Sequence, residues 1–342
     1  MIIIACNSPL LAVKQGFTST GAVKYMPLGR YSPEMLQQYP GGIKIPCGKC
    51  RGCRAQKARA WADRMVLELD HSPKAIFLTL TYNDSHVPCR FDQTTGQAVL
   101  SLNKRDLQLF FKRLRKHFAE KVEVDGKKEF IYKELRYYAC GEYGSRTHRP
   151  HYHAILYGVD LEDFPDRKLH GVNELGNQFF ISDVLQNDIW KNGFCYMSDV
   201  SWNTCAYVAR YVKKKDMGFV TDEFIERVIE PEFSVSSRNP GIGLYYPKEH
   251  PDCFEYSVYH FGDNGSSVEV YLPPAFLRSL KESKFKRDQV LYEELMSTRR
   301  KAMYDADFSK MMSTNRDYMD LGDMAEEKLN LTGQVIDYYR GL

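Results

Sequence analysis

Long hydrophobic runs are missing from this sequence of 342 residues. None of its apolar stretches approaches the roughly 20 residues that a transmembrane helix needs, so we expect no membrane partner. The first residues carry no basic segment ahead of their short apolar stretch, which predicts that the chain is not exported. Because hydrophobic residues make up 43% and charged residues 27%, we expect a soluble protein with a buried core.

Acidic residues are scarce in the first 60 positions, which hold nine Lys or Arg but only the acid Glu34. The net charge of the whole chain is +3, so the excess of positive charge is local. A clustered basic face is typical of proteins that bind polyanions, whereas a solvated helix face is the alternative. We expect five of these residues to contact a DNA backbone: Lys49, Arg51, Arg54, Lys57 and Arg59.

A disulfide framework is not expected, because the nine cysteines are an odd number in a chain without an export signal. Two overlapping C-x-x-C units, formed by Cys47, Cys50 and Cys53, allow three thiolates to converge on one zinc ion. A tetrahedral site needs a fourth ligand, for which Cys6 is the best candidate. His71 and Cys89 are weaker candidates, and a set of ordinary thiols is the alternative to a structural zinc.

Apolar periodicity predicts an α+β fold with an antiparallel sheet. In chain order we expect a helix at 53–72, a strand at 75–82, a polar loop at 84–100, a helix at 107–118, a hairpin of strands at 131–142 and 151–157, a short helix at 183–190, a strand at 194–200, and a helix from a cap at Asn203 to Lys215. This β-α-β-β-α-β order is the split βαβ pattern of ferredoxin-like folds. We expect three parts: a basic segment at 1–72, the core with its flanking helices at 73–272, and a helical extension at 273–342.

Two histidines, His151 and His153, share one face of the second hairpin strand because side chains alternate along a strand. The partner strand places Glu142 on this face, and His148 in the turn is the competing third ligand. Two imidazoles and a carboxylate suit a divalent cation, Mg²⁺ or Mn²⁺, that acts on a phosphate. Two histidines simply buried in the sheet are the alternative.

The helix expected at 203–215 places Tyr207 and Tyr211 one turn apart on one face, and Lys214 or Lys215 continues the stripe. Paired tyrosines at this spacing are common in cores. On its own the pattern therefore does not decide a function.

Together these motifs resemble the replication initiator proteins of gokushoviruses, small single-stranded DNA bacteriophages of the microvirus family. Those proteins belong to the HUH endonuclease superfamily of rolling-circle replication initiators. The similarity runs from Cys47 to about Gly243. It rests on five stretches in family order: Pro46–Arg54, Phe77–Tyr82, Gly141–Leu156, Tyr207–Lys214 and Arg238–Gly243.

The resemblance implies that His151-Tyr152-His153 is the HUH motif and that Tyr207 and Tyr211 are the nucleophiles. Such an enzyme nicks single-stranded origin DNA, becomes joined to the 5′ phosphate, leaves a 3′ hydroxyl as primer, and later rejoins the strand. The metal held by the histidines and Glu142 would stabilise the transition state. A nearby lysine, Lys214 or Lys215, would favour the phenolate.

The resemblance also implies a site of action in the host bacterial cytoplasm. Because the motif G-x-x-x-x-G-K-[ST] is absent from the sequence, a fused helicase is not expected. Strand separation is then expected from supercoiling or a host helicase, and a host polymerase would extend the primer.

Two other functions fit the same residues. One is a non-catalytic, zinc-containing nucleic-acid-binding protein, and the other is a metal-dependent phosphoesterase that uses water. Only the nicking enzyme forms a covalent adduct with DNA. If neither helix tyrosine is the nucleophile, Tyr143 is the nearest alternative.

Overall fold

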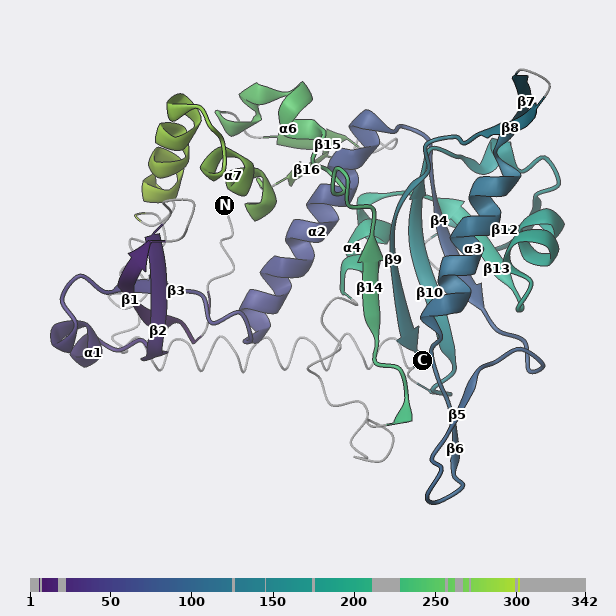
Figure 1. Ribbon diagram of the computed structural model, residues 1–342, viewed down its shortest axis with the longest axis horizontal. Coiled ribbons are helices and arrows are strands. Elements are labelled where there is room, and N and C mark those ends of the chain that lie inside the picture. The colour runs from purple at the N-terminus through teal and green to yellow at the C-terminus, as the bar shows by residue number, and fades with distance from the viewer. Residues whose placement is uncertain are drawn as a thin grey trace. The chain divides into compact units, whose positions relative to one another are not determined.

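The computed structural model describes residues 6, 8–17, 23–124, 127–144, 146–173, 176–210, 228–255, 258–261, 267–270, 272–298 and 301 (Figure 1). The chain divides into two compact units. One comprises residues 1–57 and 277–342, and the other comprises residues 58–276. We expected boundaries at 72 and 272, and the three-part division stays a prediction.

The first unit contains a small antiparallel sheet that the sequence pattern did not predict. Its order is β2 (Val23–Arg30), β1 (Leu10–Phe17) and β3 (Ile43–Ile45). Pro27 and Gly29 interrupt β2, and such residues are depleted in strands, which explains the omission. Helix α1 (Pro33–Gln38) follows, and the Ser32 hydroxyl caps it by accepting a hydrogen bond from the Met35 amide.

The second unit is built on a seven-stranded sheet whose neighbouring strands are all antiparallel. From one edge to the other the strands are β11 (Lys168–Val172), β12 (Gln178–Ile181), β13 (Cys195–Asp199), β4 (Ala75–Thr81), β10 (Pro150–Tyr157), β9 (Arg136–Tyr143) and β14 (Phe233–Ser236). The expected hairpin is confirmed, because β9 and β10 pair with His151 opposite Glu142. The expected α+β class with an antiparallel sheet is also confirmed.

Helices cover both faces of this sheet. Helix α3 (Lys104–His117) and the short helix η2 (Val184–Trp190) pack on the face that holds Tyr152, Ala154 and Leu156. Residues from Ala58 onward of α2 (Arg51–His71), together with α4 (Trp202–Arg210), pack on the other face. The two histidines lie on strand positions of this second face, since they alternate with the first set along β10.

Several expected element boundaries are wrong in detail. The polar segment 84–100 contains the hairpin of β5 (Cys89–Phe91) and β6 (Ala98–Leu100). The strand expected at 131–142 begins at Arg136, and β8 (Lys127–Ile131) pairs instead with β7 (Glu120–Val124). Helix α4 begins at Trp202 rather than after Asn203, because the Ser201 hydroxyl accepts a hydrogen bond from the Thr204 amide.

The remaining short elements follow the sheet or connect its strands. They are η1 (Leu161–Asp163), α6 (Tyr246–Glu249), η4 (Pro251–Phe254), β15 (Val258–Phe261), β16 (Ser267–Val270) and α7 (Pro274–Lys281). In the expected helical extension, residues 274–281 and 286–298 are helical, and 302–342 lie outside the described residues. Among the helices described, none combines the length and apolar character needed to cross a bilayer.

Candidate metal and tyrosine site

Two imidazoles and one carboxylate converge on the α2/α4 face of the large sheet. The Nε2 atoms of His151 and His153 lie 2.8 Å and 2.9 Å from the same oxygen, Oε1 of Glu142. The strand register causes this convergence, because Glu142 is directly opposite His151 and diagonal to His153. The structure therefore brings together the three residues predicted from the sequence, and His148 is not part of this cluster of described residues.

The outer nitrogens of both rings are held by hydrogen bonds that set their orientation. Nδ1 of His151 lies 3.1 Å from the carbonyl oxygen of Arg149, which can only accept, so this nitrogen carries a proton. Nδ1 of His153 lies 3.0 Å from the hydroxyl of Thr79. The sequence pattern did not single out Thr79, although its place opposite His153 follows from the strand register.

The chemistry of this cluster fits a cation. With Nδ1 protonated, a neutral His151 offers a lone pair at Nε2, and this lone pair faces the carboxylate oxygen of Glu142. Two acceptors that face each other are stable only with a proton or a cation between them. The three side chains thus form a ligand set with a predefined orientation.

The carboxylate of Glu142 is almost fully buried, and only 2% of the residue is exposed. Burial by itself would raise the pKa of this carboxyl. The hydrogen bonds and positive charge that His151 and His153 provide outweigh burial and hold the pKa well below its usual range. The site therefore keeps an anionic ligand at neutral pH.

Tyr207 on α4 reaches the same cluster. Its hydroxyl lies 3.4 Å from Nε2 of His153, and the two rings meet edge to face with centroids 5.0 Å apart. Phe77 of β4 stacks on the other side of the His153 ring, with centroids 5.6 Å apart and planes 8° apart. The other residues predicted from this helix, Tyr211, Lys214 and Lys215, lie outside the described residues.

The middle residue of the histidine motif, Tyr152, points to the opposite face and anchors the strand there. Its hydroxyl is 2.8 Å from the Tyr82 hydroxyl, donates to the carbonyl oxygen of Asn103 (2.9 Å) and accepts from the Asn103 amide (3.0 Å). The Tyr82 hydroxyl in turn donates to Asp106 (2.7 Å). This buried network ties β10 to β4 and to the start of α3.

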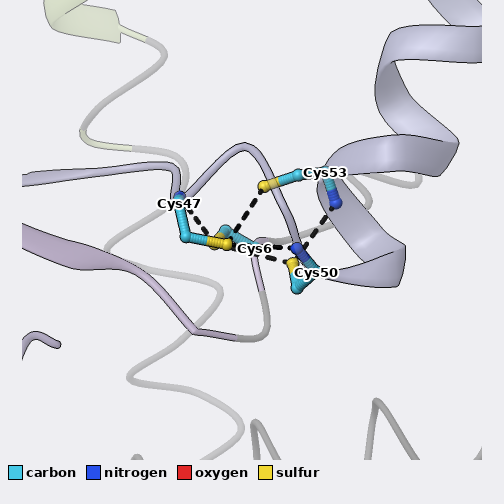
Figure 2. Close-up of side chains that lie close together, drawn as sticks. All are labelled: Cys6, Cys47, Cys50 and Cys53. Atoms are coloured by element: carbon cyan, nitrogen blue, oxygen red, sulfur yellow. Dashed lines mark hydrogen bonds between the residues drawn. The ribbon is translucent and has the colours of Figure 1, made fainter. Parts of the chain in front are cut away.

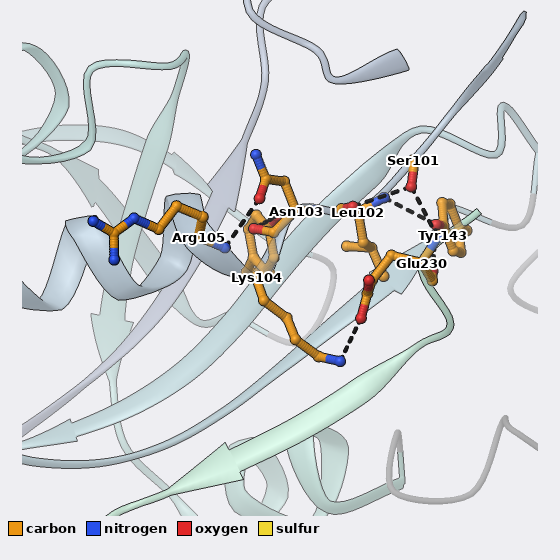
Figure 3. A network of polar contacts seen from close by, with 8 residues as sticks. Ser101, Leu102, Asn103, Lys104, Arg105, Tyr143 and Glu230 are labelled. Atoms are coloured by element: carbon orange, nitrogen blue, oxygen red, sulfur yellow. Dashed lines mark hydrogen bonds and ion pairs between the residues drawn. The ribbon is translucent and has the colours of Figure 1, made fainter. Parts of the chain in front are cut away.

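Tyr143, which we considered an alternative nucleophile, also belongs to the opposite face (Figure 3). Its hydroxyl donates to the carbonyl oxygen of Glu230 (2.7 Å) and accepts from the Leu102 amide (2.9 Å). Burial raises the pKa of this phenol. Because the hydroxyl is committed to backbone groups across the sheet from Glu142, the suggestion that Tyr143 attacks DNA was wrong.

Four cysteines of the first unit converge as the spacing predicted, and Figure 2 shows their sulfur atoms pointing toward one another. The Sγ atoms of Cys6 and Cys50 are 3.8 Å apart, and those of Cys47 and Cys53 are 4.0 Å apart. Tetrahedral zinc with Zn–S bonds of about 2.3 Å requires sulfurs about 3.8 Å apart. The weaker candidates His71 and Cys89 are not part of this cluster.

Backbone amides support the same thiols. The Cys50 amide donates to Sγ of Cys47 (3.3 Å), the Cys53 amide donates to Sγ of Cys50 (3.4 Å), and the Cys47 amide donates to Sγ of Cys6 (3.2 Å). A hydrogen bond with Cys53 lowers the pKa of the Cys6 thiol to about 5. Donors aimed at sulfur favour the thiolate, which is the form that binds a metal.

The five basic residues expected to contact DNA differ in their surroundings. Lys49 and Lys57 are exposed, and the Arg54 guanidinium donates to the carbonyl oxygen of Lys49 (2.8 Å). Arg59 forms an ion pair with the buried Asp63 at 3.0 Å and also donates to the carbonyl oxygen of Glu269 (2.6 Å). The side chain of Arg51 is not described.

Known proteins share the region that carries this site. The family model for the phage replication-associated protein ORF2 matches residues 75–216, which include Glu142, His151, His153 and Tyr207. The chain is related to phage replication initiators. The relationship to this family confirms the resemblance seen in the motifs.

Individual phage replication proteins show how far this similarity extends. The replication-associated protein VP4 of Bdellovibrio phage phiMH2K is 32% identical over 203 residues, which cover 59% of this chain and 56% of that protein. The replication-associated protein ORF2 of Spiroplasma virus 4 is 28% identical over 301 residues, 87% of this chain and 86% of that protein. No solved structure matches the chain.

Proposed function

We propose that this protein is a rolling-circle replication initiator that nicks single-stranded origin DNA through a tyrosine and later rejoins the strand. One observation carries the proposal: the Nε2 atoms of two histidines meet at one carboxylate oxygen, with the Tyr207 hydroxyl 3.4 Å from one of them. A ligand set for a cation beside a hydroxyl nucleophile suits the cleavage of a phosphodiester.

The strand order supports an HUH endonuclease core of ferredoxin-like type. The four central strands lie in the order β13, β4, β10 and β9, while their order along the chain is β4, β9, β10 and β13. Helix α3 lies between β4 and β9 in the chain, and η2 lies between β10 and β13. This is the split βαβ arrangement, with the histidine strand at its centre.

We propose that His151, His153 and Glu142 hold one Mg²⁺ or Mn²⁺ ion. When bound, such an ion neutralises the non-bridging phosphate oxygens and favours ionisation of a nearby phenol. Thr79 and the Arg149 carbonyl group would keep the imidazoles oriented, since outer hydrogen bonds of this kind fix the ring that ligates.

The proposed reaction breaks one P–O bond and forms another. The phenolate oxygen of Tyr207 attacks the phosphorus, the bond to the 3′ oxygen breaks, and that oxygen takes a proton from solvent to leave a 3′ hydroxyl. The 5′ phosphate stays on the tyrosine as an ester. Attack by a 3′ hydroxyl on that ester reverses the step and joins DNA without ATP.

The second tyrosine, Tyr211, would allow a further cleavage when the origin is regenerated, and Lys214 or Lys215 would favour a phenolate. Supercoiling or a host helicase would separate the strands, and a host polymerase would extend the 3′ hydroxyl. The reaction would take place in the cytoplasm of the bacterial host.

We also propose that Cys6, Cys47, Cys50 and Cys53 bind a structural zinc ion. The sulfur separations of 3.8 Å and 4.0 Å support this, because they match a tetrahedral tetrathiolate site. The zinc would hold the chain segments around Cys6 and Cys47–Cys53 together. It would thereby present the basic residues Lys49, Arg54 and Lys57 to DNA.

A denaturing gel tests the nicking function directly. The protein is incubated with labelled single-stranded phage origin DNA and Mn²⁺, and a parallel reaction contains EDTA. We expect a labelled protein–DNA adduct and a free 3′-hydroxyl fragment only with Mn²⁺. Cleavage without an adduct would support the phosphoesterase, and DNA binding without cleavage would support the non-catalytic binder.

A further inference from the structure

We propose that a groove beside the histidine pair binds one unpaired nucleobase of the DNA substrate, next to the phosphate that reacts. The inference rests on the proposed nicking function and adds a determinant of sequence preference to it. The groove has a volume of about 620 Å³ and is lined by β4, β11–β13 and the start of α4. Such a volume lies within the range of about 300–1,000 Å³ that is usual for small-molecule sites.

The groove begins where the candidate metal site ends. Phe77 and Thr79 line it, and the same two residues stack on the His153 ring and hydrogen-bond to its Nδ1. Thr204 of α4 also lines it, and Tyr207 lies three residues further along this helix. Residues at this spacing share a helix face, so the groove adjoins the candidate nucleophile as well.

Three aromatic rings from neighbouring strands gather in the groove. His170 of β11, Phe179 of β12 and Tyr196 of β13 have centroid separations of 5.3–6.1 Å. Phe179 and Tyr196 are half-buried, so a face or edge of each stays accessible. Stacking of a base on such a ring contributes about 1–3 kcal/mol and tolerates any base.

Side-chain amides supply the polar groups that can contact the edge of a base. Asn177 and Gln178 line the groove, are exposed, and make no side-chain hydrogen bond to any described residue. An amide both donates and accepts, which matches the paired groups on base edges. The turn that carries them is ordered, since the Asn173 side chain accepts a hydrogen bond from the Asn177 amide (2.9 Å).

The charge of the groove favours a base over a phosphate. Its described lining includes no Lys or Arg, and it includes the carboxylate of Asp199. Proteins hold the DNA backbone mainly through cationic groups, so a phosphate would be repelled here. Aromatic faces and neutral amides instead suit an unstacked base from a single strand.

Binding of matched oligonucleotides tests the proposal without any cleavage. Fluorescence anisotropy in EDTA compares oligo-dT of about 12 nucleotides with an abasic oligomer of equal length and equal phosphate number. We expect the wild type to prefer oligo-dT. In Phe179→Leu/Tyr196→Leu this preference should fall by about 5- to 100-fold, because the leucines keep bulk but remove the rings. Affinity for the abasic oligomer should not change.

A matched control is Phe130→Leu/Tyr132→Leu, which removes two exposed rings that do not line the groove. It should retain the full preference for oligo-dT. If the groove variant also retains it, the proposal is wrong. Should the groove variant fail to melt cooperatively, photocrosslinking of wild type to a 5-bromodeoxyuridine oligomer decides: a crosslink at Phe179 or Tyr196 supports the proposal, and crosslinks only elsewhere overturn it.

The outcome also separates this proposal from the nicking function. An adduct with origin DNA together with an unchanged base preference of the groove variant would remove only the groove. Absence of any adduct would remove the nicking function, while the base preference would still show whether the groove binds DNA.

Discussion

The hydroxyl of Tyr207 and the Nε2 atom of His153 lie 3.4 Å apart, although the two residues are 54 positions apart in the chain. The two rings meet at 85°, so the tyrosine presents its hydroxyl to the ligand nitrogen rather than its ring face. A metal at His153 would therefore lie next to the phenol that it needs to activate.

Removal of this hydroxyl should affect chemistry and leave folding intact. Because Tyr207→Phe keeps the ring that packs against His153 and Phe77, we expect the free energy of unfolding to change by less than about 1 kcal/mol. If the tyrosines alternate, Tyr207→Phe and Tyr211→Phe should each retain some cleavage or joining in a single-turnover assay. A Tyr207→Phe/Tyr211→Phe protein that still forms an adduct would falsify the tyrosine assignment.

Loss of the carboxylate should abolish metal binding. We expect Glu142→Gln, His151→Ala and His153→Ala each to lower cleavage by at least about 100-fold while most DNA binding remains, because each removes a proposed ligand. Mn²⁺ at 100 times its Kd should stabilise the wild type by about 2.7 kcal/mol in thermal unfolding and should not stabilise Glu142→Gln. The control Glu129→Gln alters an exposed carboxylate and should behave like wild type.

The buried hydroxyl of Tyr152 should matter for stability rather than for chemistry. Tyr152→Phe leaves the Asn103 amide and the Tyr82 hydroxyl without this partner, so we expect a loss of about 1–3 kcal/mol in urea unfolding. Tyr132→Phe changes a residue that is 58% exposed and should cost almost nothing. Equal unfolding midpoints for the two variants would contradict the role of the network.

Metal analysis should find a single zinc in the purified protein. We expect Cys47→Ser/Cys50→Ser to lose it, since two of four thiolates are then missing. Cys89→Ser removes an exposed thiol outside the cluster and should keep the zinc. Zinc that is absent from wild type, or that persists in the double variant, would show that the four thiols bind no zinc.

The basic residues of the first 60 positions should divide into two classes. Neutralising Lys49, Arg54 and Lys57 should reduce the salt dependence of single-strand binding by about 2 in log–log slope, because three backbone contacts are lost. Arg59→Gln should mainly lower stability, since its guanidinium is paired with the buried Asp63. An unchanged slope in the triple variant would mean that these residues form only a solvated face.

Local pattern determined much of the site. Alternation along β10 placed His151 and His153 on one face, and the C-x-x-C spacing brought Cys47, Cys50 and Cys53 together. Helix α2, helix α3 and the hairpin of β9 and β10 follow from apolar periodicity, which acts over a few residues. The order of motifs along the chain was sufficient to indicate kinship with phage replication initiators.

Only the tertiary structure decided which distant groups meet. The sheet order set Thr79 against His153, turned Tyr143 away from the histidines, and brought β11–β13 alongside them to form the groove. Strand register across a sheet depends on packing of both faces at once, and a periodic pattern within one strand does not contain it. Residue types and their faces are therefore legible in the sequence, whereas partners that lie tens of residues apart are chosen by the packed sheet.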